Sequence, residues 1–169
     1  SLCPQDWSDD NHSNHSLTTN TIQNLSENNS PPPSPGQIKS RLELIKELST
    51  EEDIVSFATA IANLETEDKW MIRARDGMIN GSPFAACWID HQLKITSDMT
   101  LDSVFQSEIL LVTNIIRDRE FSEGVRALLI DKDKNPNWQF PDVSSVPNDR
   151  LEKMFEPPWP NNPLADLGT

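Results

Sequence analysis

Apolar residues recur at helical spacing along most of this sequence, and that periodicity restricts the fold more than any other feature. Between residues 36 and 131 they lie three or four positions apart, which places their side chains on one face of an α-helix. No segment has a clear apolar–polar alternation of the kind that marks a half-buried strand. We therefore predict an all-α fold.

Start and stop signals divide this region into about six helices. Ser34–Pro35 and Ser82–Pro83 each combine an N-cap residue with proline at the first helical position. Ser49 and Glu52 have the spacing of a capping box, and Asn80–Gly81 is a helix stop. The predicted helices cover 36–48, the segment from Ile54 to Leu64, 66–79, the segment from Phe84 to Ile95, 101–117 and about 119–131, and one more short helix is expected near 148–155.

The helix predicted over 101–117 is the most apolar of them. Its large apolar side chains cover most of its circumference: Leu101, Val104, Phe105, Ile109, Leu111, Val112, Ile115 and Ile116. A helix that is apolar nearly all round belongs in the interior, so we expect it to lie centrally in the packing. Since five other helices leave part of it uncovered, we also expect residues 101–131 to present an apolar face to a partner.

The two ends of the chain differ in composition from this helical region. Residues 1–33 are rich in Asn, Ser, Thr and Asp, and their few apolar residues cannot offset the entropy lost on ordering. We predict a disordered or loosely ordered polar segment there, followed by a helical region over 34–156. Residues 157–169 contain four prolines, which indicates an extended Pro-rich tail.

Charge and composition argue against several kinds of partner. The formal net charge of −13 argues against nucleic acid and anionic membranes, because both are bound through Lys and Arg clusters. No apolar run approaches the length of about 18 residues that a membrane span needs. Cys3 and Cys87 do not make a disulfide framework, and the two cysteines and three histidines lack the spacing of a metal site. We predict no metal site.

No catalytic constellation is recognisable among the motifs. Asp90 and His91 are adjacent on a predicted helix, so their side chains point about 100° apart and form no direct dyad. His91 continues an apolar stripe and is interpreted as a residue at the edge of the core, and Cys87 on the same stripe as a small buried residue. The charged run 117–120 is interpreted as a solvated junction.

Residues 121–138, FSEGVRALLIDKDKNPNW, combine helix and loop signals. A glycine inside a helix costs up to about 1 kcal/mol relative to alanine, so Gly124 calls for a packing reason. We expect it to let another helix or strand approach the backbone closely. Asp131–Asn135 then form a polar exit turn, Pro136 prevents the helix from continuing, and Trp138 folds back as an apolar anchor.

The same stretch closely resembles the C-terminal signature of the 3-hydroxyisobutyryl-CoA hydrolase branch of the crotonase (enoyl-CoA hydratase/isomerase) superfamily. There an aromatic-x-E-G-V-R-A run leads into I-D-K-D-x-x-P-x-W. SPFAACWIDHQL resembles the Ser–Pro helix of that branch, and TLDSVFQSEILLVTNIIRDREF resembles the long helix before the signature. The similarity covers about residues 36–156.

The resemblance implies a function that depends on a part not matched here. Crotonases bind acyl-CoA and stabilise an enolate or a tetrahedral oxyanion with two backbone N–H groups. In the hydrolase branch, acidic residues of the N-terminal αβ core assist thioester hydrolysis. Nothing in this sequence matches those elements. The resemblance therefore implies the helical C-terminal region of such a protein, without a catalytic residue of its own, and with coenzyme A present only as part of the substrate.

One residue carries a candidate binding role. In the wider superfamily the exit turn reads more like E-K-R, and its lysine can approach the adenosine-phosphate end of CoA. Lys132 matches that lysine, while Asp133 stands in place of the arginine. Lys132 is therefore a candidate CoA contact, and the alternative is a solvent-facing lysine.

Three functional hypotheses remain open. In the first, the chain completes or covers the CoA site of a crotonase-type core, in the same protein or in another subunit, and self-associates when isolated. In the second, it is a catalytically silent crotonase homologue that serves as a structural subunit of a larger assembly. In the third, it is a helical adaptor unrelated to CoA. The resemblance implies the mitochondrial matrix for a eukaryotic source and the cytoplasm for a bacterial one.

Overall fold

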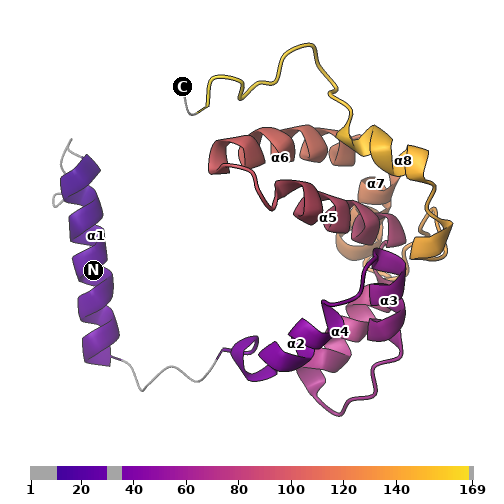
Figure 1. Ribbon diagram of the computed structural model, residues 1–169, viewed down its shortest axis with the longest axis horizontal. Coiled ribbons are helices and arrows are strands. Elements are labelled where there is room, and N and C mark those ends of the chain that lie inside the picture. The colour runs from indigo at the N-terminus through magenta and orange to yellow at the C-terminus, as the bar shows by residue number, and fades with distance from the viewer. Residues whose placement is uncertain (1–10, 30–35, 168–169) are drawn as a thin grey trace. The chain divides into compact units, whose positions relative to one another are not determined.

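The computed structural model describes residues 11–29 and 36–167. Within these ranges the chain forms α-helices, short 3-10 helices and one π-helical turn, and no strand, so the all-α prediction is confirmed. Two units are distinguished, Ser1–Leu42 and Glu43–Thr169 (Figure 1). The domain boundaries that we placed after residues 33 and 156 stay predictions.

The first unit contains α1 (Asn11–Asn29) and the 3-10 turn η2 (Lys39–Arg41), which leads into α2 (Leu42–Leu48). Helix α1 lies in the segment that we expected to be disordered or loosely ordered. A helix satisfies its own backbone hydrogen bonds, so it can form where few apolar residues are available. The apolar side chains of Ile22 and Leu25 are 61% and 51% exposed. The N-cap predicted at Ser34–Pro35 lies outside the described residues.

Helices α3 (Ile54–Ala62) and α4 (Lys69–Asn80) pack against each other. Each begins at an aspartate whose carboxylate accepts a hydrogen bond from a backbone N–H of the first turn: Asp53 from Ser56 at 2.8 Å, and Asp68 from Trp70 at 2.8 Å. The capping box predicted at Ser49 is wrong. The Ser49 hydroxyl donates back to the Ile45 carbonyl at the end of α2 instead.

Helices α5 (Pro83–Thr96) and α6 (Leu101–Ile116) carry most of the core. The predicted N-cap of α5 is confirmed, because Ser82 Oγ accepts from the Ala85 N–H at 3.1 Å. The core cluster is formed by Phe84, Leu111 and Met154, and partly buried apolar residues surround it: Trp88, Ile115, Phe140, Val146, Leu151 and Phe155. The core therefore joins α5 and α6 to the segment that follows residue 139.

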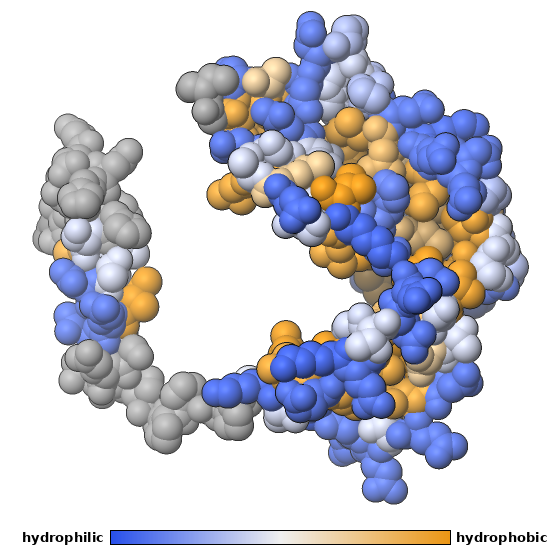
Figure 2. All heavy atoms as spheres, viewed as in Figure 1, coloured by the Kyte–Doolittle hydropathy of each residue, from blue (hydrophilic) through white to orange (hydrophobic). Residues whose placement is uncertain are grey.

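Helix α6 does not lie centrally in this chain, so that expectation is wrong. Leu111 is its one buried residue, while Leu101, Phe105, Val112 and Ile116 are 68%, 47%, 45% and 58% exposed. These four residues, the α6 stripe, are spaced by four, seven and four positions and so lie along one line of the helix. Apolar side chains accordingly reach the surface of this unit (Figure 2).

Helix α7 (Arg119–Val125) continues directly into the π-helical turn η3 (Arg126–Ile130), and α8 (Asn148–Glu152) lies between the 3-10 turns η4 (Val143–Ser145) and η5 (Lys153–Phe155). Eight α-helices are therefore present in the described ranges, rather than about six. The six predicted between residues 36 and 131 correspond in order to α2–α7. The additional helices are α1 and α8, and α8 with η5 lies where a short helix was expected.

The end of the described chain is turned rather than extended. Residues 157–167 form bends and turns and run back along α6 (Figure 1). Two reciprocal hydrogen bonds fasten this segment: Gln106 Nε2 donates to the Leu164 carbonyl at 2.9 Å, and Asn162 Nδ2 donates to the Gln106 carbonyl at 2.8 Å. The prolines prevent a helix here, but side-chain contacts with α6 replace the extended tail that we predicted.

Candidate functional site

Trp138 folds back, as the sequence predicted, and its ring lies against Gly124. A Cβ placed on Gly124 would lie 3.3 Å from Cη2 of the Trp138 ring, so only glycine leaves room for the indole without a shift. The group that approaches the glycine is thus a side chain of the same segment, and not another helix or strand as we expected. Trp138 Nε1 also donates to the Asn80 carbonyl at 3.0 Å, which ties the exit loop, residues 131–138, to the end of α4.

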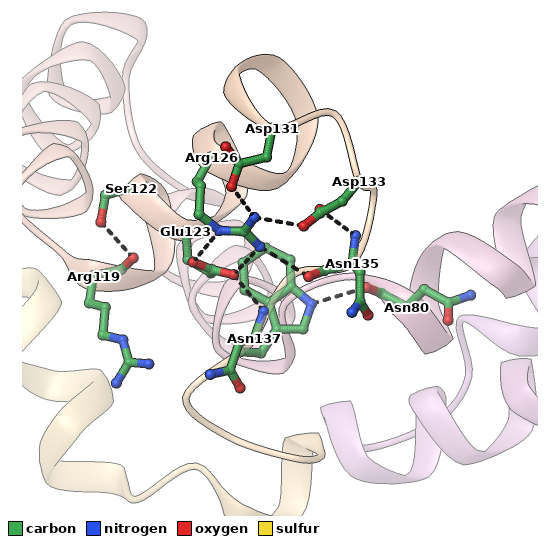
Figure 3. Close-up of polar contacts among 10 residues, drawn as sticks. Asn80, Arg119, Ser122, Glu123, Arg126, Asp131, Asp133, Asn135 and Asn137 are labelled. Atoms are coloured by element: carbon green, nitrogen blue, oxygen red, sulfur yellow. Dashed lines mark hydrogen bonds and ion pairs between the residues drawn. The ribbon is translucent and has the colours of Figure 1, made fainter.

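Arg126 is the centre of a polar cluster that closes the exit loop (Figure 3). Its Nε and Nη2 atoms donate to the two carboxylate oxygens of Glu123 at 3.1 and 2.8 Å. Its Nη1 atom donates to Asp131 at 2.6 Å and to Asp133 at 2.7 Å, and Nη2 also donates to the Asn135 carbonyl at 3.1 Å. One guanidinium therefore binds both ends of the loop.

The same cluster shifts the ionisation of its members. Arg126, with the Asn137 N–H that donates to Glu123 at 2.6 Å, lowers the pKa of Glu123 to about 2. Arg126, followed by the Asn135 N–H, also lowers the pKa of Asp133. The hydrogen bonds to these carboxylates raise the pKa of Arg126 in turn. At neutral pH Glu123, Asp133 and Arg126 are therefore charged.

The two lysines of the exit loop lie outside this cluster. Lys132 and Lys134 have φ angles of +57° and +54°, which are uncommon for residues other than glycine. Both are exposed, and neither makes an ion pair within the part of the chain that the structure describes. The Lys134 N–H donates to the Ala127 carbonyl at 3.0 Å, which fixes the loop at the end of η3. The CoA role of Lys132 stays a prediction.

Asp118 and Glu120 are structural, so the interpretation of residues 117–120 as a solvated junction is wrong for them. Glu120 is 8% exposed, and its carboxylate accepts from the Ser82 hydroxyl and from the Gln139 N–H. Asp118 accepts from the Glu120 N–H at 2.9 Å and pairs with Arg150. The preference of aspartate for N-cap positions could have indicated the cap, but the other partners lie too far along the chain to be read from local sequence.

The exit loop borders an apolar cavity of about 540 Å3. Its wall comes from α5, α6, α7 and η3, and includes Phe84, Trp88, Ile115, Phe121, Val125, Leu128, Leu129 and Trp138. Leu128 and Leu129 of this wall, together with Ile130, form the η3 ridge. Their side chains are 61%, 62% and 69% exposed, respectively. A second apolar groove of about 700 Å3 lies between α3, α4 and α5. These are surfaces suited to binding apolar groups rather than to acid–base chemistry.

The remaining candidate residues have ordinary structural contacts. The His91 ring packs against Phe155 at a tilt of 50°, with ring centroids 4.4 Å apart, and Asp90 pairs with Lys94 at 2.9 Å, so the two neighbours do not form a dyad. Cys87 is 5% exposed, and burial raises the pKa of its thiol. Across the described residues, no three His, Cys, Asp or Glu side chains are grouped as a metal site would need. In the same ranges no helix is both long and apolar enough to cross a bilayer.

A family model supports the resemblance that the exit-loop sequence carries. The model described as enoyl-CoA hydratase/isomerase matches residues 3–155. The chain belongs to the enoyl-CoA hydratase/isomerase family. The match also extends over residues before 36, where the sequence resemblance was not assigned.

Its similar relatives include 3-hydroxyisobutyryl-CoA hydrolases, which confirms the resemblance to that branch. The mitochondrial enzyme of Gallus gallus is 33% identical over an alignment of 92 residues, and the match covers 46% of this chain and 24% of that protein. The mitochondrial enzyme of Homo sapiens is 40% identical over 65 residues, which are 38% of this chain and 17% of that protein. The chain thus spans about a quarter or less of these two relatives.

Solved structures agree on the fold. A crystal structure of an enoyl-CoA hydratase from Rhodobacter sphaeroides 2.4.1 superposes with a TM-score of 0.66 and 17% identity, over 93% of this chain and 44% of that one. The crystal structure of a carnitinyl-CoA dehydratase from Mycobacterium thermoresistibile superposes with a TM-score of 0.68 and 17% identity. That match covers 89% of this chain and 45% of the other. At this identity the matches show that the helical arrangement is that of part of a crotonase-type protein.

Proposed function

We propose that this chain is the helical C-terminal part of an acyl-CoA hydrolase of the 3-hydroxyisobutyryl-CoA hydrolase type, and that it completes or covers the CoA site of a crotonase-type core. The observation that carries the proposal is the uncovered apolar surface. The α6 stripe and the η3 ridge expose seven large apolar side chains, at 45% or more each, in a chain of this family. Such continuous apolar faces are normally buried against a partner.

The core would supply the chemistry, and this chain would supply the cover. Thioester hydrolysis needs donors for the oxyanion and a positioned acid or base. The described residues bring no such groups together, since Asp118, Glu120, Glu123 and Asp131 are each engaged in structural hydrogen bonds or ion pairs. The acyl-CoA would therefore be bound between the core and this chain, with the exit loop toward the phosphates and Lys132 as a CoA contact.

The names of the relatives bear on the location. The hydrolases from Gallus gallus and Homo sapiens are described as mitochondrial. For a eukaryotic source we therefore propose the mitochondrial matrix. For a bacterial source the cytoplasm stays our prediction.

A reconstitution experiment tests the proposal. The chain is mixed with a crotonase-type core that lacks its own C-terminal helices, and thiol release from 3-hydroxyisobutyryl-CoA is followed. We expect no hydrolysis by the chain alone, and hydrolysis by the mixture that exceeds that of the core alone. A complex that forms but does not hydrolyse the thioester would favour the alternative of a silent structural subunit. Hydrolysis by the chain alone, abolished by a point substitution within it, would refute our assignment of the active site to the core.

A further inference from the structure

The exit loop alternates in charge, as Asp131-Lys132-Asp133-Lys134. Its aspartates form ion pairs with another residue, whereas its lysines do not. Arg126 takes up both aspartates through its Nη1 atom, at 2.6 and 2.7 Å. The two lysines have no ion-pair partner among the described residues. The aspartates therefore pair with Arg126 and not with the neighbouring lysines, so the two kinds of charge are separated in their pairing.

The backbone of the loop supports this separation. Both lysines adopt left-handed φ angles, and the Lys134 N–H is fixed on the Ala127 carbonyl at 3.0 Å. Asp133 also accepts from the Asn135 N–H at 2.9 Å, which holds its carboxylate within the loop. Strained backbone of this kind persists only where surrounding contacts hold it, and Arg126 supplies most of those contacts here.

We propose that Arg126 is a positioning residue that withdraws Asp131 and Asp133, so that Lys132 and Lys134 act together as a phosphate-binding pair. The inference rests on the proposed function, since the phosphates of an acyl-CoA would be the natural ligand. It goes further in adding Lys134 to the site and in giving Arg126 a role that requires no contact with the ligand.

The sum of the charges shows what Arg126 can and cannot do. Three cations, Arg126, Lys132 and Lys134, face three anions, Glu123, Asp131 and Asp133, so the cluster is formally neutral. Arg126 therefore determines where the charges lie and not how many there are. In a chain with net charge −13, a phosphate would bind here only through close contacts, and added salt should weaken that binding.

The test is a titration of the whole chain with adenosine 3′,5′-bisphosphate, followed by NMR of the backbone amides of residues 131–135. Inorganic phosphate and adenosine are titrated separately, so that binding of any phosphate is distinguished from binding of a nucleotide. Shifts with the bisphosphate and not with adenosine are expected. Lys132→Ala and Lys134→Ala should each weaken binding by roughly two- to fivefold at low salt.

The decisive comparison concerns Arg126. Arg126→Gln frees both aspartates and should weaken binding by at least as much as either lysine variant. Adding Asp131→Asn and Asp133→Asn to Arg126→Gln should restore binding, because the freed carboxylates no longer compete for the lysines. A purely structural role would not be rescued in this way. A restored triple variant thus supports the inference, and a triple variant as weak as Arg126→Gln overturns it.

Glu108→Gln is the matched control, because it neutralises an exposed carboxylate on α6 and leaves the Arg126 cluster intact. Its affinity should stay close to that of the unmodified chain. No binding of the bisphosphate to the chain would overturn the inference while leaving the reconstituted hydrolysis unaffected. Binding at the exit loop, without hydrolysis by the reconstituted complex, would keep the inference and refute the proposed hydrolase function.

Discussion

The exit-loop region and helix α6 differ in how far their side chains find contacts within this chain. Around the exit loop, three side chains find their partners within the chain: Arg126 has four, the Glu120 carboxylate has two, and the Trp138 indole has one. On α6 one side is buried, while the α6 stripe is 45–68% exposed. The first region is specified by its own sequence, whereas the second requires a surface that the described residues do not supply. The difference indicates a chain that folds locally and is completed by a partner.

The largest expected effect contrasts two phenylalanines. Phe84 is 1% exposed in the core, and Phe105 is 47% exposed on the α6 stripe. Phe84→Ala should lower the free energy of unfolding of the isolated chain by about 3–5 kcal/mol, and Phe105→Ala by less than about 0.5 kcal/mol. Urea denaturation measures both. Equal losses would show that α6 is buried in the isolated chain, by self-association or otherwise.

Glu120 tests the polar side of the comparison. Glu120→Ala leaves the Gln139 N–H and the Ser82 hydroxyl without their acceptor, and should cost about 1–3 kcal/mol of stability. Glu108→Ala, an exposed glutamate on α6, is the control and should change stability by less than about 0.5 kcal/mol. A Glu120→Ala chain as stable as the control would mean that these hydrogen bonds contribute little.

Two glycines should respond with opposite signs. A methyl group on Gly124 meets the Trp138 ring, whereas nothing lies within 4 Å of one on Gly77 in the interior of α4. Gly124→Leu should therefore destabilise the chain by roughly 1–3 kcal/mol through overpacking. Gly77→Ala should stabilise it by about 0.5–1 kcal/mol through helix propensity. Thermal unfolding measures both variants. If both substitutions raised the unfolding midpoint, the close contact between Trp138 and Gly124 would be refuted.

A smaller effect should appear in acid. Because Arg126 lowers the pKa of Glu123 to about 2 from an ordinary 4.5, this carboxylate stabilises the fold at pH values above about 4.5. That contribution is lost as the pH falls from about 4.5 toward 2, since in this range the unfolded state binds the proton while the folded state does not. Glu123→Gln should make stability less dependent on pH in this window. If stability of the Glu123→Gln variant depended on pH as it does in the unmodified chain, groups other than Glu123 would cause the loss of stability in acid.

The features that the sequence predicted are those set by neighbouring residues. The Ser82 cap depends on residues three positions apart, and the return of Trp138 follows from a polar turn after the helix, where Pro136 excludes further helix. The Arg126 cluster was also within reach, because Glu123 and Arg126 have the i, i+3 spacing of a helical ion pair. It was missed because charged residues at a helix end are usually solvated.

The features that the sequence did not predict depend on distant parts of the fold. Glu120 is buried because Ser82 and Gln139 meet it from 38 and 19 positions away, and local sequence does not encode that meeting. The burial of α6 was predicted from its composition alone. Composition shows that a helix needs cover, but it does not show whether the same chain provides it.

Sedimentation of the purified chain, with and without a crotonase-type core that lacks its own C-terminal helices, tests the central claim most directly. We expect a stable complex with the core, self-association of the chain alone, and loss of both when Leu101 and Phe105 of the α6 stripe are changed to serine. Because both positions are exposed, the two substitutions should leave the fold itself intact. A compact monomer that ignores the core and is indifferent to the two substitutions would contradict the claim that a partner completes this chain.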